Sequence, residues 1–347
     1  MKYRIISIFV LAIFVLNIGA STFADSKIKR SAASELVSLL PASDGVVTFD
    51  VRRFLDEALP KLLASNQTML ARVTGEIDKV QEKFGIDIRQ FEHVAAGVTT
   101  KRISDKDYDM DPVLIARGQT SSASLIGAAK LAAKGKYREE TIGDRTIYIF
   151  EGKKIAAANK PQVGNAKTDA AVEKAIEKLS SEIAVAAVDS TTIAFGSPAR
   201  VRQTVDGKTK VALDITGLLE RNQTSIVNFA GKLPAGVKSF IPLDNDELGK
   251  NIDSIQYVYG NANVVADVAS LNFTARTQQN AQAKSLYETL SGLQMIGKGL
   301  LSGAKGADKQ AYKRMIENAK ISVKANEIVF DLQVPQSDID IIVATLK

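Results

Sequence analysis

The chain has 347 residues, of which 45 are Lys or Arg, 39 are Asp or Glu and one is His, and it contains neither Cys nor Trp. Without cysteine there is no disulfide framework, no thiolate nucleophile and no cysteine-ligated zinc or iron–sulfur centre, and one histidine excludes a site built on several histidine ligands. The apolar fraction of 45% is that of an ordinary globular protein, which disfavours disorder and fibrous repeats.

The first 24 residues carry the pattern of a secretory signal peptide. Lys2 and Arg4 precede an apolar run, and small residues follow up to Ala24, so the pattern predicts cleavage after Ala24. The run is shorter than the roughly 20 residues of a membrane-spanning helix, although an uncleaved N-terminal anchor stays the alternative. We therefore expect an exported chain, periplasmic or extracellular, with no transmembrane helix in its mature form. Because its basic residues are scattered, we expect no nucleic-acid partner.

The sequence repeats itself at an offset of 164 residues. Residues 47–56 match residues 211–220, and residues 85–94 match residues 249–258 in the same register. Two chance matches would rarely share one register, so we interpret them as the trace of an internal duplication. The expected organisation is a signal peptide over 1–24, an N-terminal linker over 25–35, a first αβ repeat over 36–207 and a second over 208–347.

The first repeat begins with a strand and two helices. An apolar strand is predicted over 46–51, and Asp50 stands at the N-cap position of a helix over 52–63 that Pro60 should kink or split. A second, amphipathic helix over 68–84 should end at Gly85, since glycine favours the left-handed conformation of a helix C-terminus.

Hairpins and helices are predicted farther along the chain. The patterns indicate strands over 91–98 and 112–117, a helix over 122–134, a hairpin over 139–151 turning at Gly143-Asp144, a linker over 152–167, a helix over 170–179 and a hairpin over 183–195 turning at Asp189-Ser190. The longest helix, over 278–301, should bury the face formed by Leu286, Leu290, Leu293, Ile296 and Leu300. These elements predict an α+β fold of two tandem related modules, each a mainly antiparallel sheet with helices packed on it.

His93 is the first candidate for chemistry because it is the one histidine of the chain. It could act as a general base or bind a metal. Its counterpart in the second repeat is Tyr257, which shares its size and polar tip but neither its titration nor its ligand chemistry. The pair therefore favours a packing role for His93.

Asp50 and Asp214 are the acidic pair that both matched segments retain. Facing each other, two carboxylates could do acid–base work or bind a cation. The simpler interpretation is that each caps the helix that begins after it. The first interpretation would require the two carboxylates to share one cleft.

The acidic segment Asp105–Asp111 resembles a calcium loop only superficially. An EF-hand needs Gly at its sixth position and Glu at its twelfth, where this sequence has Met110 and Ala116. We expect a solvated acidic loop, and leave open whether it binds a cation. No catalytic, cofactor-binding or metal-binding residue is assigned, and no cofactor is expected.

Three segments carry a loose resemblance to a known class of proteins. They are residues 39–51 (LLPASDGVVTFDV), residues 84–87 (FGID) and residues 193–198 (IAFGSP). In these segments the chain resembles uncharacterised exported bacterial proteins built from two αβ repeats. The resemblance implies an architecture, but neither a substrate nor catalytic residues.

Three functions are compatible with the sequence. We expect first a non-enzymatic exported binding or scaffold protein, with an unidentified protein or envelope ligand as its partner. The second is a carrier that holds a small or lipidic ligand in an apolar cavity between sheet and helices. The third is an envelope hydrolase that relies on two carboxylates. An apolar pocket would favour the carrier, and two carboxylates about 5–10 Å apart in one cleft would favour the hydrolase.

Overall fold

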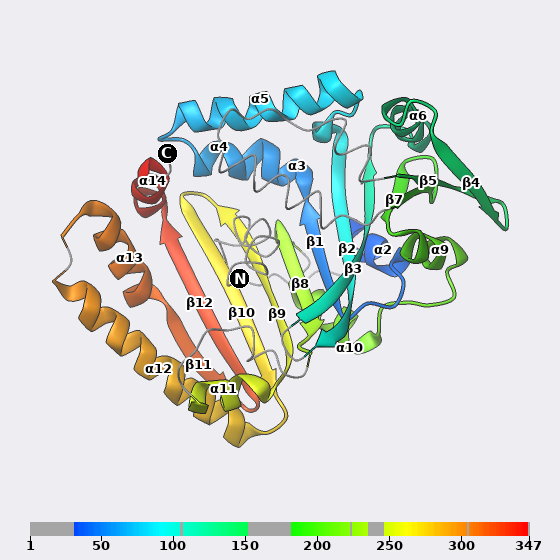
Figure 1. Ribbon diagram of the computed structural model, residues 1–347. Coiled ribbons are helices and arrows are strands. Elements are labelled where there is room, and N and C mark those ends of the chain that lie inside the picture. Colours follow the sequence, from blue (N-terminus) through cyan, green and yellow to red (C-terminus); the bar gives the residue numbers. More distant parts are fainter. Residues whose placement is uncertain are drawn as a thin grey trace.

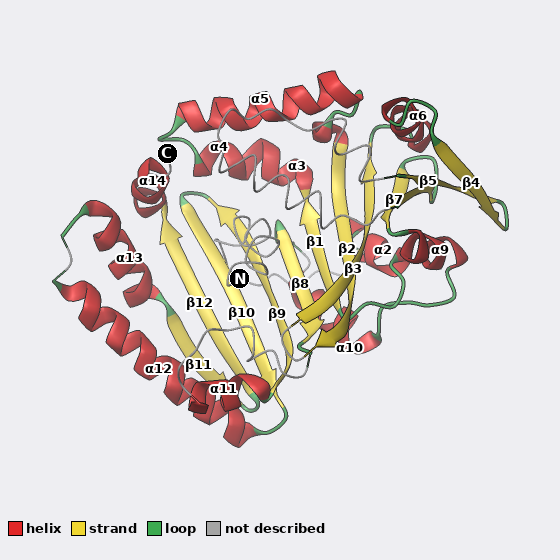
Figure 2. Cartoon of the chain, viewed as in Figure 1, coloured by secondary structure: helices red, strands yellow, loops and turns green. Residues whose placement is uncertain are grey.

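The computed structural model of the chain describes residues 31–104, 107–151, 182–222, 224–234, 246–303 and 305–345. It has the predicted α+β fold, with helices packed on one large antiparallel sheet (Figures 1 and 2). The expected linker over 152–167 and the expected helix over 170–179 lie outside the described residues. In the described part of the chain, no helix combines the length and apolar character that crossing a membrane requires.

The sheet has twelve described strands in the order β11-β12-β10-β9-β8-β1-β2-β3-β7-β6-β5-β4. Every neighbouring pair is antiparallel. The strands are β1 (Gly45–Asp50), β2 (Phe91–Ser104), β3 (Asp107–Gly118), β4 (Tyr137–Ile142), β5 (Arg145–Phe150), β6 (Ile183–Ala187), β7 (Thr192–Gly196), β8 (Val227–Lys232), β9 (Ile255–Val265), β10 (Val268–Thr277), β11 (Lys320–Lys324) and β12 (Glu327–Pro335).

Helices cover both faces of this sheet. They are α2 (Ala32–Leu39), α3 (Val51–Arg53), the π-helical turn η1 (Phe54–Ala58), α4 (Leu59–Leu62), α5 (Gln67–Phe84), the 3-10 turn η2 (Ile88–Gln90), α6 (Ser122–Ala132), α9 (Pro198–Asp206), α10 (Leu213–Leu219), the 3-10 turn η3 (Glu220–Asn222), α11 (Asp246–Asp253), α12 (Asn280–Ser302), α13 (Ala307–Asn318) and α14 (Gln336–Thr345). Helix α2 begins inside the segment that the sequence assigns to a linker.

Each face of the sheet has its own core, because successive side chains of a strand point to opposite faces. Helices α2, α9 and α10 bury Leu36, Val201 and Ile215 with Val46 and Ala230 of the central strands. On the opposite face, α4 and α14 pack with β8, β9 and β12, α6 with β5 to β7, and α11 and α12 with β12. The face that holds α2 and α10 is therefore a distinct layer.

Local signals in the first half act as predicted. The Oδ1 atom of Asp50 accepts the backbone N–H of Arg53 at 2.9 Å, which caps α3. The predicted interruption at Pro60 takes the form of the π-helical turn η1, after which α4 begins with Pro60 in its first turn, since proline has no N–H to donate within a regular α-helix. Gly85 ends α5 with φ 68° and ψ 16°, the left-handed conformation that glycine adopts without strain.

The predicted hairpins are confirmed, with one correction between β2 and β3. Gly143, with φ 60°, turns β4 into β5, and β6 and β7 form the hairpin around residues 189–190. The acidic segment is not the predicted loop, because Asp109 and Asp111 lie in β3 opposite Lys101 and Thr99. Opposite charges across a strand pair stabilise this longer hairpin. Asp105 lies outside the described residues.

The second half differs from the sequence prediction at its first matched segment. Residues 211–214 match the first strand in sequence, yet they lead into helix α10, and the strand beside β1 is β8. The second pair of matched segments, 85–94 and 249–258, agrees with the structure. Phe91 and Ile255, which are 164 residues apart, begin β2 and β9, and these strands lie beside β1 and β8 respectively.

The apolar face of α12 is buried only at its beginning. Leu286 is buried, whereas Leu293, Ile296 and Leu300 are 45%, 60% and 78% exposed. The helical spacing was interpreted as one buried face, but the sheet covers only the first turns of the helix. Periodicity shows which side chains share a face and not what packs against that face.

Candidate functional site

His93 lies in β2 and Tyr257 in β9, and the surroundings of the two side chains differ. His93 lies in β2 directly opposite Asp50 of β1, and its Nδ1 atom is buried with no hydrogen-bond partner among the described residues. Tyr257 lies in β9, where its hydroxyl donates to Oδ2 of Asp214 at 2.6 Å. No group of three or more His, Asp or Glu side chains in the described residues is placed to hold a metal ion.

Asp50 and Asp214 do not share a cleft. Asp50 ends β1, whereas Asp214 binds Lys232, which lies beside the beginning of β1. A six-residue strand therefore separates them, on the order of 15 Å along its length. Asp50 is an N-cap as predicted, but the N-cap residue of α10 is Ala212, and Asp214 lies in the first turn. The paired-carboxylate site is absent at these two residues.

A cavity beside the sheet's centre lies between α2 and α10. Its volume is about 350 Å³, and apolar atoms make up most of its lining. Thr48 of β1 and Asn228 of β8, which are direct cross-strand partners, form its floor. The remaining lining residues are Ser31, Ala33, Ser34, Val37 and Ser38 on the α2 side and Lys210, Val211, Leu213, Thr216, Leu219 and Glu220 on the α10 side.

Asn228 is the polar group that marks this cavity. Its side chain is 3% exposed, and its Oδ1 atom has no hydrogen-bond partner within the described parts of the chain. A buried polar atom without a partner is rare, since leaving it unpaired costs about 1–3 kcal/mol. Asn228 therefore belongs to the cavity lining and carries a buried acceptor that no described residue satisfies.

Asn228 belongs to a row of polar side chains that crosses the sheet. The backbone register places Thr48, Asn228, Asn261, Asn272 and Asp331 side by side on β1, β8, β9, β10 and β12. The Oδ1 atom of Asn261 accepts the Ser225 hydroxyl at 3.2 Å, and Asn272 donates to Asp331 at 2.5 Å. Asn228 differs from Asn261 because its own acceptor stays unpaired.

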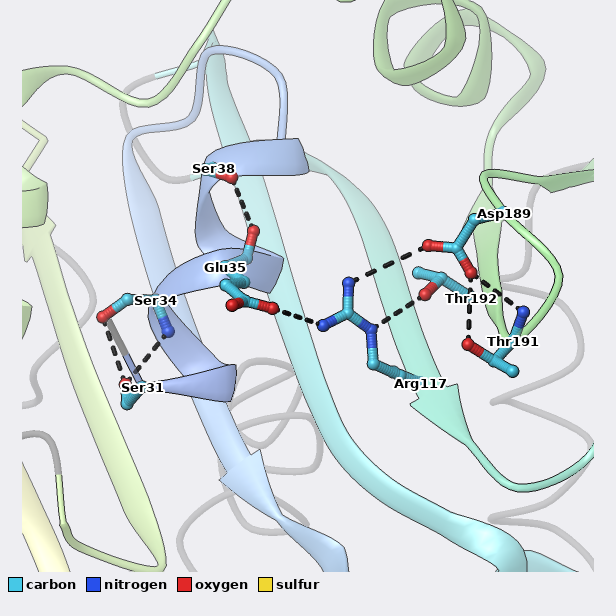
Figure 3. A network of polar contacts seen from close by, with 8 residues as sticks. All are labelled: Ser31, Ser34, Glu35, Ser38, Arg117, Asp189, Thr191 and Thr192. Carbon is cyan, nitrogen blue, oxygen red and sulfur yellow. Dashed lines mark hydrogen bonds and ion pairs between the residues drawn. The ribbon is translucent and has the colours of Figure 1, made fainter. Parts of the chain in front are cut away.

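The α2 wall is fixed by its core residues and its cap. Leu36 and Leu40 are fully buried beneath it, and the Ser31 hydroxyl accepts the backbone N–H of Ser34 at 3.2 Å. Figure 3 shows Ser31 and Ser34 on the side of α2 that points away from Arg117. The helix therefore presents hydroxyl groups to the cavity.

The other side of α2 carries an ion pair. Glu35 binds Arg117 of β3 at 2.7 Å, and Arg117 also donates to the Thr192 hydroxyl at 3.0 Å and approaches Asp189 at 3.9 Å (Figure 3). Burial alone would raise the pKa of Asp189, but hydrogen bonds from the Thr191 N–H and from neighbouring hydroxyls lower it. This network attaches α2 to the β6–β7 turn.

The α10 wall packs on the sheet through Ile215, Leu218 and Leu219, and its beginning is also tethered through charge. Asp214 accepts hydrogen bonds from Tyr257, from the Ile215 N–H at 2.8 Å and from Lys232 at 3.1 Å. The bond from Tyr257 is the largest cause that lowers the pKa of Asp214, and the bond to Asp214 raises the pKa of Lys232. Just after α10, Arg221 donates to the Tyr259 hydroxyl at 2.6 Å.

Sequence reasoning missed the whole cavity. Helix α2 was not predicted, α10 was expected only as a helix that Asp214 would cap, and Asn228 was not a candidate. One signal was present: Asn261, Asn263 and Asn272 lie in strand-forming segments, although asparagine is depleted in strands. Asparagines that recur inside strands deserve a place among candidate site residues.

Comparisons with known proteins reach only the architecture. No known protein family and no curated protein matches the sequence. Three crystal forms of the Treponema protein TP0453 are similar in structure at 10% sequence identity. The TM-scores are 0.44 for form III, 0.42 for form I and 0.44 for form IV. The matches cover 89%, 90% and 91% of this chain and 98%, 97% and 100% of the TP0453 chain, in the same order. At this identity and these scores, the likeness does not bear on function.

Proposed function

We propose that this chain is an exported, non-enzymatic binding protein that holds a small and mostly apolar ligand between α2 and α10. The observation that carries the proposal is the buried and unpaired Oδ1 atom of Asn228 at the floor of a largely apolar cavity. Ligand sites commonly combine an apolar lining with a few placed polar groups. A ligand that donates an N–H or O–H group to Asn228 would satisfy the acceptor.

The size and lining of the cavity narrow the ligand class. A volume of about 350 Å³ lies at the lower end of the range of roughly 300–1,000 Å³ for small-molecule sites. The charged residues of the lining, Lys210 and Glu220, are exposed and belong to its rim. A compact neutral molecule with an apolar body fits this lining better than a long acyl chain or a polyanion.

The order of the strands is consistent with a ligand site at the centre of a duplicated fold. β1 and β8 are neighbours, and the flanking strands follow in the order β2-β3-β7-β6 on one side and β9-β10-β12-β11 on the other. We include in the proposal that the two halves descend from one unit, with α2-β1 corresponding to α10-β8. The cavity then lies where the two copies meet.

The export step has its own test. Expression with residues 1–24 present, followed by cell fractionation and N-terminal sequencing, should give a periplasmic or secreted chain that begins at Asp25. A chain that stays in the membrane fraction with Met1 intact would support the uncleaved anchor instead.

Ligand binding can be tested with a fluorescent probe and its hydrocarbon analogue. We expect the mature chain to bind 1-naphthylamine, which carries an N–H donor, more tightly than naphthalene, which has none. Thr216→Trp should abolish binding because Thr216 lines the cavity on α10. The matched control is Thr74→Trp on α5, because both threonine hydroxyls donate to a carbonyl of their own helix.

The binding results of the two variants and the two probes distinguish the cavity from other binding sites. Loss of probe binding in Thr216→Trp with retention in Thr74→Trp supports the cavity as the site. Equal binding by both variants, at unchanged melting temperatures, contradicts it. Equal affinity for the amine and the hydrocarbon would contradict the role given to Asn228.

A further inference from the structure

The two halves of α12 present different surfaces. The first half packs Ala283 and Leu286 against β12 and exposes Lys284 and Glu288, which approach each other at 4.0 Å. Such a surface, with charges outward and apolar groups inward, is that of an ordinary surface helix. From residue 292 onward most of the outer surface is apolar residues and glycine, and Lys298 is the one charged residue in the rest of α12.

The apolar surface at the end of α12 is well exposed. Leu293, Met295, Ile296 and Leu300 are 45%, 75%, 60% and 78% exposed. At the helical angle of 100° per residue, these four side chains and the glycines at 292, 299 and 303 fill one continuous arc of the helix surface. We call residues 292–303 on this arc the α12 apolar arc.

A second observation shows that no described residue covers the glycines of this arc. A Cβ atom placed on Gly292, Gly299 or Gly303 would meet nothing within 4 Å among the described residues. By contrast, a Cβ on Gly297, which points toward α13, would lie 3.4 Å from Ile316. Contiguous apolar surface of this kind indicates an interaction site.

The charges around the arc identify the kind of partner. Residues 289–307 contain no Asp or Glu, and their two charged residues are Lys298 and Lys305. Neither lysine forms an ion pair within the described residues. A second copy of the chain meeting this arc about a twofold axis would bring lysines against lysines, which is unfavourable. A surface that is both apolar and anionic suits the arc better.

We propose that the α12 apolar arc docks on an anionic phospholipid surface. The helix would lie in the plane of the interface, with Met295, Ile296 and Leu300 among the upper acyl chains and Lys298 and Lys305 at the phosphate level. This is the geometry of interfacial amphipathic helices, whose binding combines buried apolar area with attraction to anionic lipids. The inference does not depend on the ligand proposed for the α2–α10 cavity.

The test is cosedimentation of the mature chain with vesicles. We expect binding to vesicles of phosphatidylglycerol, little binding to pure phosphatidylcholine, and weaker binding at high salt. The double variant Ile296→Glu, Leu300→Glu should bind the anionic vesicles at least about tenfold more weakly, since two apolar side chains no longer enter the membrane. Lys298→Gln should weaken binding about fivefold.

The chain offers a matched control for the double variant. Ile103 and Leu131 are 64% and 80% exposed, close to the exposures of Ile296 and Leu300 at 60% and 78%. Ile103→Glu, Leu131→Glu should therefore bind vesicles as the unmodified chain does. Melting temperatures verify that each variant is folded.

Four results would overturn the proposal. One is equal loss of vesicle binding in the control variant and in the α12 variant, and another is equal binding to phosphatidylcholine and phosphatidylglycerol. The third is a dimer in analytical ultracentrifugation that Ile296→Glu, Leu300→Glu dissociates, since a second copy would then be the occupant. Absence of vesicle binding by the unmodified chain contradicts the proposal as well.

Discussion

Helices α2 and α10 flank the same cavity, yet they are held in different ways. α2 buries two leucines completely, has a side-chain cap at Ser31 and forms an ion pair with the sheet. α10 buries Ile215, Leu218 and Leu219, but its beginning has no side-chain cap, leaves Leu213 88% exposed, and is tethered by the polar contacts of Asp214. Apolar burial therefore holds both walls, whereas at the beginning of α10 charges and hydrogen bonds take the place of the side-chain cap that α2 has.

Truncating a leucine on each wall should give the largest difference. Leu36→Ala on α2 should lower the free energy of unfolding by about 2–5 kcal/mol, because Leu36 is fully buried. Leu213→Ala on α10 should change it by no more than about 0.5 kcal/mol, since that side chain stands in solvent. Urea denaturation of both variants measures the contrast, and similar losses in the two would refute it.

The helix caps should give an intermediate effect. Ser31 and Ala212 have nearly the same backbone conformation, with φ −68° and ψ 153° against φ −64° and ψ 146°, but serine alone supplies a capping oxygen. Ser31→Ala should therefore destabilise the chain by about 1 kcal/mol. Ala212→Ser should stabilise it by only about 0.5 kcal/mol, because Asp214 already accepts the Ile215 N–H. Thermal denaturation measures both, and destabilisation by Ala212→Ser would contradict this account.

Much of the fold could be predicted where the signal is local. The cap at Asp50, the left-handed end of α5 at Gly85 and the turn at Gly143 depend on a few adjacent residues, and the structure confirms all three. The antiparallel α+β class followed from several such signals together. These elements need no knowledge of distant contacts.

The parts that could not be predicted depend on distant contacts. The run 211–219 has the apolar content of a strand, and only its packing on β8 makes it the helix α10. A short apolar run fits either state. The exposed arc of α12 and the unpaired amide of Asn228 are likewise invisible to periodicity, since each is defined by what lies opposite. For the same reason the sequence placed Asp50 and Asp214 in one pair.

The ion pair of Asp214 and Lys232 at the start of α10 should have the smallest effect on stability, and this effect should depend on pH. Asp214 has a lowered pKa, so its contribution to stability is fully present above the ordinary value of 3.8 and is lost as the pH falls through the lower pKa of the folded state. Lys232 has a raised pKa, so its contribution is lost as the pH rises above 10.5 through the higher folded value. Between these limits, Asp214→Asn should reduce stability by about 0.5–1 kcal/mol, since the pair is partly exposed.

The pH range distinguishes this tether from simple packing. The melting temperatures of the unmodified chain and of Asp214→Asn should differ at pH 7 and converge toward pH 3, because protonation removes the same carboxylate that the variant lacks. Asp206→Asn is the control, since Asp206 also binds a lysine, Lys208 at 2.9 Å, but lies at the end of α9 away from α10. A gap between Asp214→Asn and the unmodified chain that persists unchanged at pH 3 would mean that shape, and not charge, holds α10. Packing would then hold both walls of the cavity, and the proposed difference between α2 and α10 would be wrong.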